Sequence, residues 1–95
     1  MPYIQPELRP GLDVHISALA DAINSIAEGA DRDAAYAGLL NYACTSLALK
    51  TLPETRYWAI ATTSGVFANI ADEFYRRFAS HYEDEQIEKN GDVYP

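Results

Sequence analysis

The chain has 95 residues, a formal net charge of −7 and a single cysteine. This length corresponds to one domain with a modest core, and one cysteine cannot stabilise that core through an internal disulfide. The acidic balance disfavours nucleic acid and anionic membranes as partners, and no apolar run reaches the roughly 20 residues of a membrane span.

The N-terminal segment is rich in proline, at positions 2, 6 and 10. This spacing predicts an extended arm over residues 1–11, because proline disfavours helix at its own position and at the residue before it. The segment lacks a charged region followed by an apolar core, so it does not resemble a secretory signal, and a cytoplasmic location is expected. A helical core is expected over residues 12–90, with residues 91–95 as a tail.

The first helix is predicted over residues 12–28, and Gly29 is its expected end. Its apolar residues recur at alternating spacings of three and four, which indicates a narrow stripe that faces another helix. The members of this stripe are Leu12, Ile16, Leu19, Ile23 and Ile26.

The second helix is predicted over residues 32–51, with Asp31 as its N-cap. It carries a wider apolar face, made of Tyr36, Leu39, Leu40, Ala43, Cys44 and Leu47. Asn41 lies beside this face. Its side chain is expected either in solvent or in a binding pocket, and we retain it as a candidate ligand-binding residue.

The third helix is predicted to begin near residue 53, since Thr51 and Glu54 have the spacing of a capping box. The segment 62–65 contains two threonines, a serine and a glycine, so a kink or a short turn is expected there. An apolar face then continues to Tyr82, and the helix is expected to reach Lys89, with Gly91 as its left-handed end. The prediction is an all-α fold: a three-helix domain with a long, bent C-terminal helix and extended termini.

Residues 60–74 resemble a helix-turn-helix, because a small residue, a turn glycine and apolar positions follow at suitable intervals. Asp72 and Glu73 lie on the helix that would face DNA, where acidic groups are repelled by phosphates. DNA binding is therefore the least favoured hypothesis. A glycine that permits a kink or a close contact is the alternative.

Aromatic and basic residues form a candidate ligand-binding set. Arginine grips phosphate groups in a bidentate manner and aromatic rings stack on nucleobases. The set comprises Arg56, Tyr57, Trp58, Tyr75, Arg76 and Arg77. The alternative is that the arginines pair with Asp72 and Glu73 while the rings fill the core or a subunit interface.

No pattern typical of catalysis or of metal binding stands out in the sequence. The acidic residues 83–85 lack the spacing of a calcium loop, and His15 and His81 lie on different predicted helices without a nucleophile and carboxylate set. No catalytic residue, cofactor or metal ligand is predicted, and the chain is not expected to be an enzyme.

The whole chain resembles a family of short uncharacterised proteins from tailed phages and prophages. The residues that carry this resemblance are Met1-Pro-Tyr-Ile4, Leu40-Asn-Tyr42, Arg56-Tyr57, Gly65-Val66, Glu73-Phe-Tyr-Arg-Arg77, Tyr82-Glu-Asp-Glu85, Ile87 and Asn90-Gly-Asp-Val-Tyr94. The alanine-rich stretch around residues 27–37 departs from the family pattern. The resemblance implies an accessory protein inside the host bacterial cell.

Two functions fit this context and these residues. One is an oligomeric module that sequesters a small nucleotide-type immune signal, in a pocket of arginines and rings between subunits. The other is a protein–protein interaction or assembly factor that binds through its helix faces. Both hypotheses include a homo-oligomer, because the apolar faces exceed what three helices can cover.

Overall fold

The computed structural model describes residues 4–95, and all regular structure in this range is helical. The elements are the 3-10 turn η1 (Pro6–Leu8), α1 (Arg9–Glu28), α2 (Arg32–Thr51), α3 (Tyr57–Phe74), the π-helix η2 (Tyr75–Ala79) and α4 (Ser80–Asn90). The all-α fold class is therefore confirmed. Within this range the chain divides into two compact units, residues 4–54 and residues 55–95, and each is described by itself.

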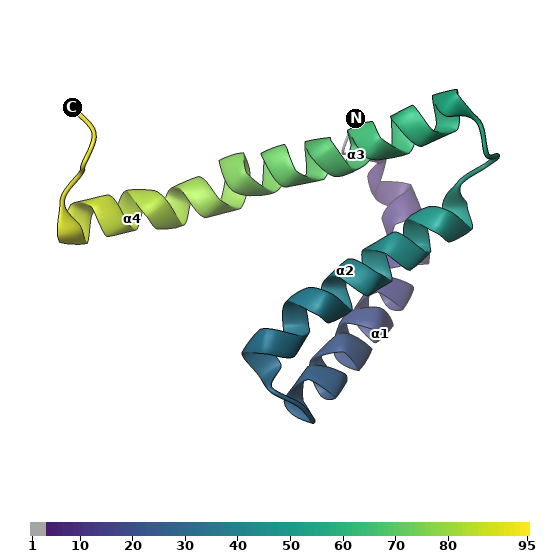
Figure 1. Ribbon diagram of the computed structural model, residues 1–95, viewed down its shortest axis with the longest axis horizontal. Helices are drawn as coiled ribbons and strands as arrows, with labels where there is room; N and C mark the ends of the chain where they lie inside the picture. The colour runs from purple at the N-terminus through teal and green to yellow at the C-terminus, as the bar shows by residue number, and fades with distance from the viewer. Residues whose placement is uncertain (1–3) are drawn as a thin grey trace. The chain divides into compact units, whose positions relative to one another are not determined.

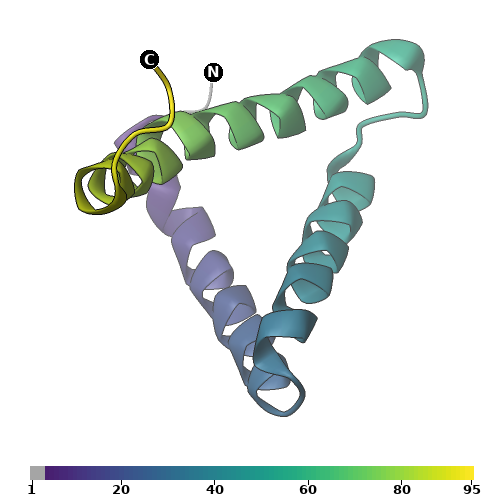
Figure 2. The same ribbon diagram turned by 60° about the vertical axis from the view of Figure 1, so that its left-hand side comes forward.

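The N-terminal unit is a hairpin of α1 and α2 (Figures 1 and 2). The two helices lie closest at the turn that joins them and separate toward their other ends (Figure 2). Ala27, just before this turn, is fully buried, and Ile23 and Ala35 are half-buried. The core of this unit therefore lies near the turn, where small side chains allow the helices to approach each other.

Only part of the apolar stripe predicted for the first helix is buried inside this hairpin. Ile23 is half-buried, whereas Leu12, Ile16, Leu19 and Ile26 are exposed. On α2 the predicted face is divided in the same way. Leu39, Ala43 and Cys44 are half-buried, and the exposed members are Tyr36, Leu40 and Leu47.

The N-terminal segment is helical where an extended arm was predicted. Pro6 and Pro10 each lie in the first turn of a helix, where a missing N–H costs no intrahelical hydrogen bond. Arg9 Nε and Nη2 donate hydrogen bonds to the carbonyl oxygen of Ile4, at 3.3 and 3.2 Å. The predicted arm over residues 1–11 is thus wrong for residues 6–11, and its residues 1–3 lie outside the described range.

The link between α2 and α3 corrects the predicted capping box. Thr51 ends α2, and its hydroxyl donates to the carbonyl oxygen of Leu47 at 2.9 Å. Leu52 leaves the helical conformation because the residue before a proline is driven out of it, so Pro53 ends α2. Arg56 is extended, and α3 begins at Tyr57 instead of near residue 53.

The C-terminal unit contains one long helix, formed by α3, η2 and α4 in sequence (Figure 1). It spans Tyr57–Asn90, which corresponds to about 51 Å at a rise of 1.5 Å per residue. Gly91 ends it with φ of 86°, which confirms the predicted glycine stop.

The irregularity in this helix lies at η2 and not at residues 62–65. Thr63 Oγ1 donates to the carbonyl oxygen of Ala59 at 2.9 Å, so its hydroxyl is satisfied within the continuous helix α3. In η2 the N–H of Ser80 bonds the carbonyl oxygen of Tyr75, five residues earlier. The predicted kink at 62–65 is wrong. The helix-turn-helix interpretation, which needs a turn at that place, is wrong for the same reason.

Candidate functional site

The first group of candidate ligand-binding residues lies at the start of α3. Arg56 is the extended residue before the helix, and its carbonyl oxygen accepts a hydrogen bond of 3.0 Å from the N–H of Ile60. Tyr57 is 85% exposed and Trp58 is 52% exposed. The first N–H groups of a helix lack intrahelical acceptors and carry the positive end of the helix dipole. This end of α3 therefore combines a guanidinium, two accessible rings and backbone donors.

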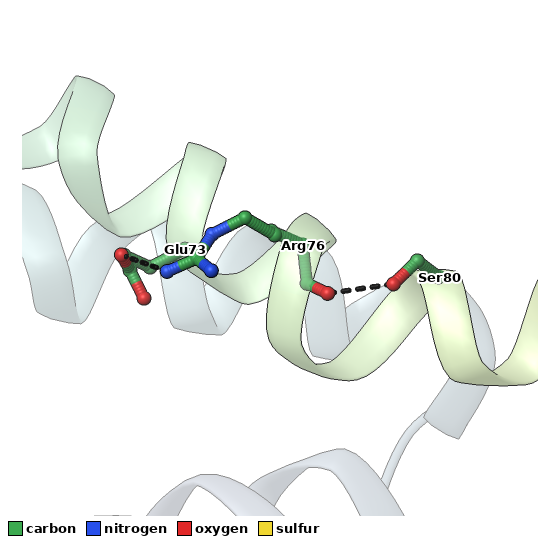
Figure 3. A network of polar contacts seen from close by, with 3 residues as sticks. All are labelled: Glu73, Arg76 and Ser80. Atoms are coloured by element: carbon green, nitrogen blue, oxygen red, sulfur yellow. Dashed lines mark hydrogen bonds and ion pairs between the residues drawn. The ribbon is translucent and has the colours of Figure 1, made fainter.

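The second group lies in η2, where carboxylates contact Tyr75 and Arg76. Arg76 Nη2 forms an ion pair of 2.7 Å with Glu73 Oε1, and the Arg76 side chain remains 68% exposed (Figure 3). The Tyr75 hydroxyl donates a hydrogen bond to Glu83 Oε1. This bond, together with the negative charge of Glu83, raises the pKa of Tyr75 above its ordinary value. The alternative interpretation of the arginines, as partners of acidic residues on the same helix, is thus realised for Arg76.

The polar contacts around Arg76 also explain the local backbone. Ser80 Oγ donates a hydrogen bond of 2.6 Å to the carbonyl oxygen of Arg76, while the Arg76 side chain extends in the other direction, toward Glu73 (Figure 3). In a π-helical turn the usual i→i+4 pairing is interrupted. The Ser80 hydroxyl supplies a donor to this carbonyl and so stabilises the turn.

The two groups lie far apart along one helix. Eighteen residues separate Tyr57 from Tyr75, which corresponds to about 27 Å along the helix axis. A small nucleotide cannot contact both groups on one copy of this unit. The single set predicted from the sequence is therefore two surfaces in the structure, because α3 is continuous and carries no turn that would bring them together.

Asn41 lies on α2, in the N-terminal unit. Its Oδ1 accepts a hydrogen bond of 3.2 Å from Thr45 Oγ1. These two residues line a shallow surface hollow together with Ala37, Gly38 and Tyr42. The hollow contains no charged group, so it offers hydrogen bonding and ring contact but no partner for a phosphate.

An apolar face runs along the C-terminal helix, and we call it the C-terminal seam. Its members are Ile60, Thr63, Phe67, Ile70, Phe74, Phe78 and Tyr82. The rings of Phe74 and Phe78 stack, with centroids 5.2 Å apart and an interplanar angle of 21°. Both rings are nevertheless mostly accessible, with exposures of 62% and 68%. The sequence predicted this face from Phe67 to Tyr82, but not its extension to Ile60 or its regular spacing, which is the signal of a helix–helix contact.

A second hollow lies where the chain leaves α4. The positive φ of Gly91 turns the tail, and the N–H of Tyr94 donates a hydrogen bond of 2.9 Å to Asp92 Oδ1. Gln86 and Ile87 line the hollow from the helix, and Val93 and Tyr94 line it from the tail. The acidic residues 83–85 of α4 are exposed, as expected of a solvated helix face.

Other chemistry-bearing groups are scattered along the described residues. His15 lies on α1 and His81 on α4, and Cys44 is a half-buried free thiol on α2. Between residues 4 and 95, no three side chains of His, Cys, Asp or Glu are grouped so that they could hold a metal ion. Over the same range, no helix combines the length and the apolar character that crossing a membrane requires.

A family model described as Domain of unknown function (DUF6899) matches residues 1–93, so the chain belongs to that family. Neither a curated protein nor a solved structure matches the chain.

Proposed function

We propose that this member of the DUF6899 family is a binding module that works as a homo-oligomer and not as an enzyme. The observation that carries the proposal is the exposure of large apolar side chains along the C-terminal seam. Within residues 4–95, the fully buried residues are Ala27 and Ala59 alone. A chain with so small a core gains stability when a partner covers its apolar faces, and contiguous exposed apolar surface is typical of interaction sites.

The chemistry of the exposed groups supports binding. Phenyl, indole and aliphatic side chains contribute packing and stacking, and guanidinium groups contribute charged hydrogen bonds. These groups hold a partner without changing its covalent structure. The resemblance to tailed-phage and prophage proteins suggests where such a module acts, namely in the cytoplasm of the host bacterial cell.

The ligand that we propose is a small nucleotide-type immune signal, which the oligomer would sequester. The start of α3 supports this choice, because Arg56 and the adjacent backbone N–H groups suit a phosphate, while Tyr57 and Trp58 suit a base. The alternative is a protein partner, bound through the exposed helix faces.

Light scattering tests the oligomer. At high micromolar concentration, we expect a mass of at least twice that of one chain. A monomeric mass under these conditions would contradict the proposal.

Thermal shift measurements with cyclic dinucleotides and ADP-ribose-type compounds test the ligand. A bound ligand raises the free energy of unfolding by about 2.7 kcal/mol at a hundredfold excess over Kd, which raises the melting temperature. Arg56→Ala should abolish the shift, and Arg32→Ala, at the start of α2, is the matched control. If none of these compounds shifts the melting temperature, the hypothesis of a nucleotide-type ligand is contradicted, and the alternative of a protein partner is favoured.

A further inference from the structure

The C-terminal seam has the spacing of a helix that packs along another helix. From Ile60 to Phe74 its members alternate at intervals of three and four, which is the 3.5-residue period of coiled coils. From Ile70 to Tyr82 the intervals are all four. In an ordinary α-helix each such interval rotates the side chain by about 40° beyond a full turn, so the face would drift away from its partner.

The π-helix η2 takes up this drift. Its hydrogen bonds span five residues instead of four, so this turn holds an additional residue. The stacked rings of Phe74 and Phe78 show that the face continues from the end of α3 into η2. One apolar face therefore runs from Ile60 to Tyr82, which corresponds to about 33 Å of helix.

The order of residues along this face is nearly symmetric. A twofold rotation about a point near Ile70 and Ala71 exchanges the positions on either side of it. The exchanged pairs are Ile60 with Tyr82, Thr63 with Phe78 and Phe67 with Phe74. Such a face is self-complementary, as the interface of a dimer with twofold symmetry requires.

The distribution of charge favours the antiparallel orientation. Residues 57–71 contain no charged side chain, whereas residues 80–95 contain five acidic residues and one lysine. Two parallel copies would place these acidic runs against each other, and like charges at close range are unfavourable. An antiparallel copy centred near Ile70 and Ala71 instead brings the acidic residues 83–85 beside residues 56–58 of its partner, where Arg56 is the charged side chain.

We infer that two copies of this chain pair through the C-terminal seam in antiparallel orientation, centred on Ile70 and Ala71. The inference rests on the self-association proposed above and adds its surface and its orientation. Each seam then covers its counterpart, so Phe67 of one copy packs against Phe74 of the other. The same arrangement places the Arg56–Trp58 surface of each copy beside the acidic residues 83–85 of its partner.

Distance measurements between spin labels test the orientation. Single cysteines replace Asn69 or Asp84 in full-length chains that carry Cys44→Ser, and the label pairs are measured by double electron–electron resonance. Asn69 lies near the proposed centre, so its two labels should be separated by about 4.5 Å along the helix axis, and those on Asp84 by about 40 Å. Short distances at both positions indicate parallel helices, and long distances at both exclude the seam. Either result overturns the inference while self-association stands, whereas the absence of dipolar coupling at both positions contradicts self-association itself.

A matched pair of substitutions tests the surface. Ile70→Asp places a carboxylate at the centre of the seam, and Ala68→Asp places one on an exposed position of the same helix outside it. We expect Ile70→Asp to raise the dimer dissociation constant by about 30-fold or more, which is the effect of losing a central interface residue. Ala68→Asp should leave the constant nearly unchanged. Equal effects of the two substitutions would overturn the inference, and the label measurements decide the matter if Ile70→Asp fails to fold.

Discussion

Ser80 Oγ donates a hydrogen bond of 2.6 Å to the carbonyl oxygen of Arg76, at the junction of η2 and α4. Because the π-helical turn interrupts the regular backbone pairing there, we expect this bond to stabilise the turn. Ser80→Ala should lower the free energy of unfolding by about 0.5–1.5 kcal/mol, the usual net value of one hydrogen bond. Chemical denaturation measures this change, and amide exchange should accelerate in residues 75–80.

Ser64→Ala is the control for that prediction. Ser64 is exposed on α3, in the same long helix. Its replacement should be neutral or slightly stabilising, because alanine has the higher helix propensity. Similar losses of stability in both variants would show that the Ser80 hydroxyl has no special effect on the turn.

Two glycines of the C-terminal unit should respond in opposite ways to the same substitution. Gly65 lies inside α3, and a Cβ added there has no neighbour within 4 Å. Gly65→Ala should therefore raise the free energy of unfolding by about 0.5–1 kcal/mol, the difference in helix propensity. Gly91 has φ of 86° and ψ of 148°, a conformation that essentially only glycine adopts. Gly91→Ala should cost about 1–3 kcal/mol locally and displace the tail, which NMR chemical shifts of residues 90–94 would detect.

The ion pair between Glu73 and Arg76 should contribute little to stability. The two side chains are 30% and 68% exposed, so water and salt screen their attraction. A double-mutant cycle with Glu73→Gln and Arg76→Gln isolates the pair from the other contacts of each residue. We expect a coupling energy of about 0.2–1 kcal/mol that decreases in 1 M salt. A coupling that is large and independent of salt would contradict this prediction.

The titration of Tyr75 should depend on Glu83. The hydrogen bond from the Tyr75 hydroxyl and the charge of Glu83 both favour the protonated ring, so the pKa of Tyr75 lies above its ordinary value of 10.0. Because the pKa is raised in the folded chain, the stabilisation is complete below the unfolded pKa and is lost as pH rises through the folded pKa. NMR titration of the tyrosine rings should show that Glu83→Gln lowers the pKa of Tyr75. Glu85→Gln, on the same helix, should affect it less, and an unchanged pKa in Glu83→Gln would contradict the assignment.

The sequence predicted the helices well where local rules decide their ends. Gly91 stops α4 because its backbone conformation excludes other residues, and the end of α1 at Glu28 agrees with the choice of Gly29. The effect of a proline on local structure depends on its position relative to the helix, which is less evident from the sequence. Pro6 and Pro10 disfavour the helix interior but suit a first turn, and only the structure shows which position each one occupies.

Two errors arose where several local choices were compatible with the same residues. Thr51 is a residue type that often caps the start of a helix. Its hydroxyl nevertheless donates to the carbonyl oxygen of Leu47, because α2 extends to Thr51 and ends before Pro53. Thr63 and Gly65 are poor helix formers, yet α3 continues through them because a long helix tolerates a small cost in propensity. The π-turn has one signal in the sequence, the run of intervals of four from Ile70 to Tyr82.

The candidate site was predictable by residue type but not by position. The aromatic and arginine side chains of the candidate set are exposed, at the start of α3 and in η2. The two groups are about 27 Å apart because α3 is continuous. The turn that was expected at residues 62–65 would have allowed them to lie closer together.

Because the C-terminal unit consists of a single helix, the rate at which the proposed dimer forms can be predicted. Every backbone hydrogen bond in that helix joins residues close in the sequence, and such helices wind within about a microsecond. The encounter of two chains is far slower at ordinary protein concentrations. Diffusion, and not the formation of the helix, should therefore limit the rate at which the proposed dimer forms.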